Sequence, residues 1–311
     1  MDHSRKSVLI TGASSGIGRA CVEQMSHAGW QVFATVRKEK DQEKLRHIDG
    51  VQPVMMDLQD AESITAAAAQ VESQLQARGL DGLVNVAGIG MLRPVEYATM
   101  RDVREIFEIN FFGQVEVIQA FCRLLRKQRG RIVNITTVGV NFALPFGSLL
   151  NASKSAFAMV NDSLRLELHP FGVRVCAIEP GAISTPAVDK TLGDIDRLIE
   201  SLPPEAQAQY GSSIRTFARR GYEMEKNGSP PEVVAKAVHH ALTSSRPRIR
   251  YRVGKHAKLL AALPKILPES LLDVIRLRLS GLSTPSDERS PKRKSVSNRG
   301  PAIRTMRVNP K

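Results

Sequence analysis

The chain has 311 residues, of which 42% are hydrophobic and 24% are charged, a composition typical of a globular domain with a sizeable core. Its net charge of +13 is concentrated at one end, because residues 246–311 hold 17 of the 44 Lys and Arg residues but only 4 of the 31 Asp and Glu residues. The body of the protein therefore lacks the basic character of a nucleic-acid-binding protein, and nucleic acid is not an expected partner.

The three cysteines, Cys21, Cys122 and Cys176, lie far apart in apolar surroundings. Their spacing fits neither a disulfide framework nor a metal site, so we expect reduced thiols and no bound metal. The N-terminus leaves no room for a signal peptide before the first motif, and no apolar run approaches the roughly 18 residues of a membrane span. These features predict a cytoplasmic protein.

Short β-branched runs alternate with helical periods through most of the chain. Strands are predicted at 6–11, 30–36, 51–57, 82–88, 130–136 and 173–181, with helices near 16–29, 61–79, 99–128 and 152–169 and a charged helix between the second and third strands. Strands alternating with helices of this length predict right-handed βαβ units and a parallel sheet covered on both faces. The expected fold is a doubly wound (Rossmann) α/β domain.

The remaining sequence departs from this alternation. Residues 186–230 are helix-forming but less apolar, which indicates either a helical lid over a substrate pocket or a packed surface excursion. A helix near 231–244 and a strand at 248–254 then complete the domain. We therefore assign residues 1–282 to a single dinucleotide-binding domain, and 283–311, rich in Ser, Pro, Arg and Lys, to a disordered basic tail.

The first strand runs directly into a glycine-rich turn, Thr11-Gly12-Ala13-Ser14-Ser15-Gly16-Ile17-Gly18, and a helix follows at once. Glycines in this position permit a tight turn, close approach of the backbone to a pyrophosphate, and close helix–strand packing. The helix N-terminus then directs its free N–H groups toward the phosphates. The sequence therefore predicts a nucleotide site here.

The TGxxxGxG spacing of this turn resembles that of the short-chain dehydrogenase/reductase family, and the resemblance extends over residues 5–255. Asn85-Val86-Ala87-Gly88 is similar to the family's NNAG strand end, with Val in place of the second Asn, and Asp57 matches the adenine contact. Asn110 matches the active-site asparagine. Pro180-Gly181 followed by Thr185 resembles the segment whose backbone and Thr contact the nicotinamide. The resemblance implies a set of cofactor contacts: Thr11, Gly12, Ser14, Ser15, Gly16, Ile17, Gly18, Arg37, Asp57, Leu58, Asn85, Ala87, Gly88, Lys154, Pro180, Gly181, Ile183 and Thr185.

The end of the second strand indicates which dinucleotide is bound. A ribose 2′-OH is held by an acidic residue at this position, whereas a 2′-phosphate requires a cation. The strand reads VFATVRKEK, with Arg37 and Lys38 directly after it and no acid in place. We therefore expect NADP(H) rather than NAD(H), although Arg37 is also compatible with a solvated surface charge.

In this family the catalytic helix carries Tyr-x-x-x-Lys, and a serine about thirteen residues earlier holds the substrate carbonyl. By resemblance, Lys154 matches the lysine, Asn110 the asparagine that positions a relay water, and Thr137 the serine. The tyrosine position is occupied by Leu150. Moving the assignment to Asn151 would rotate the two side chains about 100° apart on a helix, and no tyrosine lies nearby in either case. Leu150 has no proton to exchange.

Two functions are compatible with this substitution. The first is an NADP(H)-dependent oxidoreductase of a lipophilic alcohol or ketone, similar to the 17β-hydroxysteroid dehydrogenase-like members, with a degenerate site in which Tyr97, Tyr210 or a water replaces the acid. The second is a catalytically silent NADP(H)-binding protein that regulates a partner. An apolar segment, Phe142 to Leu150, either lines a lipophilic pocket or packs the core.

The basic C-terminal segment, residues 255–282, carries Leu and Ile at near-helical spacing with cations between them. Such amphipathic segments contact a membrane surface peripherally, cap a lipophilic pocket, or pack on the domain or across a dimer. Family resemblance also implies a homo-oligomer formed through the helices near 99–128 and 152–169.

Overall fold

A seven-stranded parallel sheet forms the centre of the protein, with strand order β3-β2-β1-β4-β5-β6-β7. The structure, a computed structural model, describes residues 5–282, so the predicted disordered tail (283–311) lies outside the described residues. This is the doubly wound single domain expected from the sequence. The strands are β1 (Ser7–Ile10), β2 (Gln31–Val36), β3 (Val51–Met55), β4 (Gly82–Asn85), β5 (Arg131–Ile135), β6 (Arg174–Pro180) and β7 (Arg250–Val253).

Helices cover both faces of the sheet because successive strand residues point in opposite directions. In β1, Val8 and Ile10 belong to one buried cluster, which includes Met25 of α1 and Val238 of α10, while Leu9 belongs to the other, with Phe121 of α5 and Phe157 of α6. The helices of these layers are α1 (Gly16–His27), α2 (Glu39–Arg46), α3 (Ala61–Leu75), α4 (Met100–Phe107), α5 (Gly113–Gln128), α6 (Ser148–Glu167) and α10 (Glu232–Thr243).

The region near 99–128, for which the sequence predicts one helix, contains a break. A π-helical turn, η2 (Glu108–Phe112), separates α4 from α5 and holds Asn110. π-helical turns inside α-helices redirect side chains and are frequent at functional sites. The sequence pattern could not show this turn, because the apolar spacing on either side of it fits an ordinary helix.

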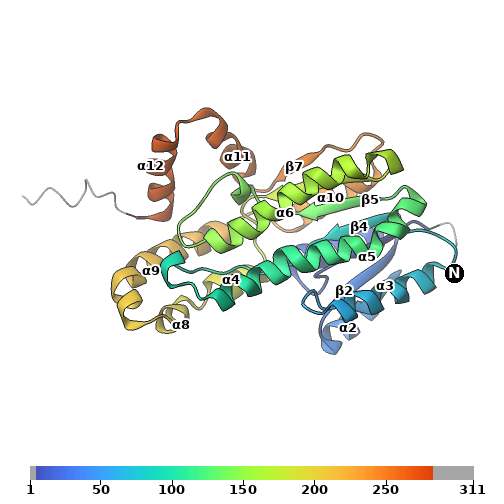
Figure 1. Cartoon of the computed structure of the whole chain (residues 1–311), viewed down its shortest axis with the longest axis horizontal. Coiled ribbons are helices and arrows are strands. Elements are labelled where there is room, and N and C mark those ends of the chain that lie inside the picture. Colours follow the sequence, from blue (N-terminus) through green and yellow to red (C-terminus); the bar gives the residue numbers. More distant parts are fainter. Residues whose placement is uncertain (1–4, 283–311) are drawn as a thin grey trace, which may run out of the picture.

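The predicted lid is made of three helices, α7 (Pro186–Leu192), α8 (Ile195–Glu200) and α9 (Pro204–Lys226). The basic segment forms α11 (Ala257–Ile266) and α12 (Glu269–Ser280). In Figure 1, α8, α9 and α12 extend beyond the sheet on the left of the view, at the end where α6 begins. The segment therefore packs partly on the domain: Ala257, Ala261 and Leu272 are buried, and α12 packs against α9.

Candidate active site

The glycine-rich turn joins β1 to α1, as predicted. Gly12 has a φ of +65°, and a Cβ there would lie 2.9 Å from the Cα atom of Ala87. A Cβ on Gly18 would lie 2.1 Å from the carbonyl oxygen of Gly12, so the start of α1 can approach the turn only without a side chain. Ser15, the N-cap of α1, makes no side-chain capping bond and the first turn has no acidic residue. The N–H groups at this helix end therefore suit an anionic ligand.

A cavity of about 290 Å³ opens in front of this turn. Eight of the residues expected to contact the cofactor line it: Gly12, Ser14, Ser15, Arg37, Asp57, Leu58, Ala87 and Gly88. The sequence reasoning missed Thr35, Val36, Met56, Ile89, Gly90 and Ile109, together with Ala187, Lys190 and Thr191 of α7. The one sequence feature that could have indicated the α7 residues as lining residues is their position just after Thr185 in the chain. The donor groups, the glycines and the cations of this cavity fit a dinucleotide phosphate.

Other residues expected to contact the cofactor hold the segments around the cavity together. The Thr11 hydroxyl oxygen accepts the N–H groups of Val86 (2.9 Å) and Ala87 (3.1 Å), which fixes the chain leaving β4 against the glycine turn. Asn85 is buried and donates to Asn134 at 2.9 Å. A Cβ on Gly16 would lie 3.2 Å from the Cβ of Thr185, so the segment after Pro180 and Gly181 lies beside the turn. The backbone N–H of Ile183 donates to Glu225 of α9.

Asn110 ties the loop after β4 to α6. Its Oδ1 accepts the N–H of Ile89 at 2.8 Å, and its Nδ2 donates to the Ile89 carbonyl oxygen (3.0 Å) and to Ser153 Oγ (3.1 Å). Both donor hydrogens of the amide are therefore used within the protein. Asn110 thus connects the loop after β4 with α6, and no sequence pattern predicted its contact with Ser153.

Lys154, on α6, lies close to Asn110 and Gly88. Its Nζ donates to the carbonyl oxygen of Ile135 at 3.0 Å, and a Cβ on Gly88 would lie 3.2 Å from this Nζ and 3.0 Å from Asn110 Oδ1. Asn110 and Lys154 thus converge on Gly88, which lines the cavity. Burial lowers the pKa of Lys154 to about 8, because an ammonium group loses solvation there.

Leu150 lies one turn before Lys154 on the same helix and is half-buried. Its side chain carries no hydrogen-bonding atom, and its carbonyl oxygen accepts the hydroxyl of Ser153 at 2.8 Å. Among the apolar residues before it, Phe142 and Leu144 line a small cavity between α9, α11 and α12, and others pack against the lid. Phe142 is 2% exposed beneath the guanidinium of Arg276, and Phe146 contacts the ring of Phe217 on α9.

Thr137 lies on the loop that follows β5. Its Oγ1 accepts the N–H of Gly139 at 3.1 Å, and no acceptor for its own hydroxyl proton is found among residues 5–282. Its neighbour Thr136 is buried and donates to the Ile178 carbonyl oxygen. Of the two hydroxyls, Thr137 is therefore the one whose proton is free for a ligand oxygen.

The hydroxyl groups of Tyr97 and Tyr210 form hydrogen bonds between the loop after β4 and α9. Tyr97 donates its hydroxyl to Gln209 at 3.0 Å, Tyr210 donates to Glu96 at 2.8 Å, and the two rings meet edge to face. Both rings pack against the apolar cluster of α8 and α9. With their hydroxyl protons used in this way, neither is placed as a substitute for the missing tyrosine.

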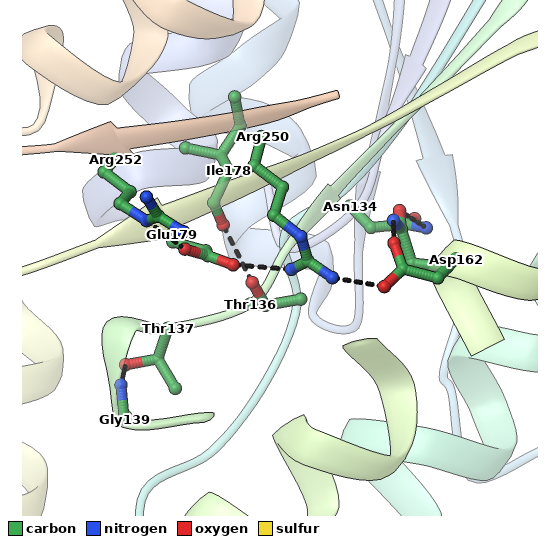
Figure 2. Close-up of polar contacts among 10 residues, drawn as sticks. Asn134, Thr136, Thr137, Gly139, Asp162, Ile178, Glu179, Arg250 and Arg252 are labelled. Atoms are coloured by element: carbon green, nitrogen blue, oxygen red, sulfur yellow. Dashed lines mark hydrogen bonds and ion pairs between the residues drawn. The ribbon is translucent and has the colours of Figure 1, made fainter. Parts of the chain in front are cut away.

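A polar network connects α6 with strands β6 and β7. Glu179 of β6 is fully buried and accepts from Arg250 (2.5 Å) and Arg252 (3.0 Å) of β7, and Arg250 also pairs with Asp162 of α6. Figure 2 shows the Arg250 guanidinium lying between these two carboxylates. Through Arg250, this network connects Asp162 of α6 with the buried Glu179 of the sheet.

The fold, the glycine turn and the converging Asn110 and Lys154 define a dinucleotide-binding protein of the Rossmann type. Residues 6–195 match the family model described as short chain dehydrogenase. The chain belongs to the short-chain dehydrogenase/reductase family, as the motifs predicted.

Several relatives extend over most of the chain. It is 33% identical over 278 residues to "Retinol dehydrogenase 5" of Homo sapiens, covering 86% of each chain. It is 35% identical over 282 residues to "17-beta-hydroxysteroid dehydrogenase type 6" of Mus musculus, covering 87% of each. A solved short-chain dehydrogenase from Streptomyces avermitilis superposes with a TM-score of 0.67 at 27% identity, over 92% of this chain and 99% of that one.

Proposed function

We propose that this protein is an NADP(H)-dependent oxidoreductase of a lipophilic alcohol or ketone whose active site lacks the usual tyrosine acid. The observation that carries the proposal is that Leu150 lies one helical turn before the buried Lys154, whose Nζ donates to the Ile135 carbonyl oxygen. Membership of an oxidoreductase family supports the reaction class. The relatives named for retinol and for a hydroxysteroid support a lipophilic substrate, as does the apolar Leu150 itself.

The choice of NADP(H) rests on Arg37 and Lys190. Arg37 is exposed at the end of β2, and both cations line the cavity. A guanidinium at this position favours a 2′-phosphate over a free hydroxyl. The test is a titration of the protein with NADPH and with NADH, for the wild type and for Arg37→Asp. NADPH should bind roughly tenfold more weakly to the variant. An unchanged NADPH affinity, or a wild type that prefers NADH, would contradict the assignment.

The bound cofactor would supply or accept the hydride, while the chain orients the substrate and moves the proton. Thr137 can donate its hydroxyl proton to a carbonyl oxygen, because only its acceptor capacity is used. Lys154 offers an ammonium group to a ribose. Leu150 supplies no proton, and removal of a positioned acid typically lowers a rate about 10²–10⁴-fold. The expected activity is therefore slow reduction, with water supplying the proton, or slow oxidation, with water accepting it.

A second function is a silent NADP(H)-binding protein that regulates a partner. The same observation favours it, because cofactor binding requires Lys154 and the glycine turn but no tyrosine. The two functions differ in turnover: the first predicts a measurable rate in the wild-type protein and the second predicts none at any substrate concentration.

We also propose that the protein forms a homo-oligomer and contacts membranes peripherally. Phe112 of η2 and Met159 and Leu166 of α6 are exposed apolar side chains, and so are Leu259 and Ile266 of α11, which lie among lysines. No helix within residues 5–282 is both long and apolar enough to cross a bilayer. Light scattering of Met159→Glu should show a smaller oligomer than the wild type, and an unchanged size would contradict the homo-oligomer.

Sedimentation with anionic phospholipid vesicles should be lost in Ile266→Glu, and unchanged sedimentation would contradict the membrane contact.

A further inference from the structure

Glu225, in the last turn of α9, contacts the segment expected to hold the nicotinamide. Its Oε2 accepts the backbone N–H of Ile183 at 2.9 Å. On the opposite edge of this segment, Ser229 donates to the Ala182 carbonyl oxygen (3.0 Å) and accepts from the N–H of Ser184 (2.9 Å). The flanking backbone is thus paired with Ser229, and the N–H of Ile183 alone is directed to the carboxyl group.

The Glu225 carboxyl group is partly buried, and no cation within residues 5–282 forms an ion pair with it. Burial raises the pKa of Glu225 to about 7, and the Ile183 N–H lowers it. The cations nearby have other partners: Lys226 pairs with Asp189, which also accepts from Tyr222, and Lys255 donates to the Asn227 carbonyl oxygen. Within residues 5–282, the Ile183 N–H is the one hydrogen-bond donor to this carboxyl group.

This contact occupies a group that the cofactor also requires. Family resemblance places Ile183 among the nicotinamide contacts, and a backbone N–H makes one strong hydrogen bond at a time. We propose that Glu225 is a positioning residue that competes with the nicotinamide carboxamide for the N–H of Ile183. Glu225 must release this N–H before the nicotinamide end of a dinucleotide can be held. The inference rests on the proposed NADP(H) binding and extends it to this chain's lid.

Release of the Ile183 N–H should change the protonation of Glu225. A partly buried carboxylate that loses its one hydrogen-bond donor among the described residues is less stable than before, so the protonated form becomes more favoured. Near neutral pH the group then takes up a proton from solvent, and no bond in the cofactor changes. The release also removes one polar contact between the end of α9 and residues 183–189, while Tyr222 and Lys226 still bind Asp189. Dinucleotide binding is thereby linked to the lid.

Calorimetric titration separates this proposal from an ordinary structural role. The full chain is titrated at pH 7.5 with NADPH and with 2′-phospho-ADP-ribose, which lacks the nicotinamide, in phosphate and in Tris buffer. The dependence of the heat on the buffer gives the number of protons taken up. The variants are Glu225→Gln, which removes the charge but keeps an acceptor, and Glu223→Gln, an exposed neighbour on the same helix, as the control.

The wild type should take up a fraction of a proton with NADPH and none with the fragment. Glu225→Gln should abolish this uptake and bind NADPH roughly fivefold to tenfold more tightly, with unchanged fragment affinity, because a neutral acceptor competes less strongly. Glu223→Gln should behave as the wild type. Proton uptake that persists in Glu225→Gln, or an equal change for both ligands, would overturn the proposal. A wild type that binds neither ligand would overturn the NADP(H) assignment, and this inference with it.

Discussion

Leu150 lies one helical turn ahead of the buried Lys154 on α6, at the spacing of the Tyr-x-x-x-Lys pair that the family resemblance leads us to expect. In the usual arrangement the lysine assists the tyrosine's ionisation and binds the ribose. Under the proposed function, only ribose binding remains for Lys154. The proposal therefore separates cofactor binding, which needs no tyrosine, from proton transfer, for which Leu150 has no group.

The ammonium charge of Lys154 should be visible in cofactor binding. Because burial places its pKa at about 8, the group is charged below this pH and neutral above it. NADPH affinity should therefore fall as the pH rises from 7 to 9. In Lys154→Met the affinity should be lower at pH 7, by roughly tenfold, and lack this step. Fluorescence titration across the pH range measures both; an identical step near pH 8 in the variant would assign the titration to another group.

The clamp made by Asn110 should contribute to stability. Asn110→Ala leaves the Ile89 N–H and carbonyl groups without their partner inside the fold. We expect a loss of about 1–3 kcal/mol in the free energy of unfolding, measured by urea denaturation. Asn227→Ala, an exposed substitution on a helix end, is the matched control and should cost less. Equal losses in the two variants would mean that the clamp contributes nothing specific.

Glu225 should make stability depend on pH. Its folded-state pKa of about 7 lies above the ordinary 4.5, so the folded protein binds the proton more tightly than the unfolded chain. The stability that this group contributes is complete below about pH 4.5 and is lost as the pH rises to about 7. Glu225→Gln, which stays neutral, should therefore gain stability relative to the wild type between pH 5 and pH 8. Urea denaturation at both pH values tests this, and a constant difference would refute it.

Sequence patterns revealed the parts of the site that depend on local spacing. The glycine turn was predictable because Gly12, Gly16 and Gly18 act within one strand–helix junction. The Leu150–Lys154 relationship was predictable because four residues make about one helical turn. The fold followed from the alternation of strands and helices, and the structure confirms it.

Contacts between distant segments could not be read in this way. Glu225 lies 42 residues after Ile183, and nothing in its surroundings on α9 marks it as different from the neighbouring Glu223. Ser153 looked like a spacer before Lys154, yet it is the partner of Asn110. The π-helical turn at Glu108–Phe112 depends on packing against α6 and not on a local sequence signal.

The central claim is that an otherwise intact NADP(H) site lacks its proton donor at Leu150. The most direct test is the steady-state rate of NADPH oxidation with a panel of lipophilic ketones, for the wild type and for Leu150→Tyr. The account predicts slow but measurable turnover in the wild type and a gain of about 10²–10⁴-fold in the variant. A wild type that turns over rapidly, with little gain from the added tyrosine, would contradict it.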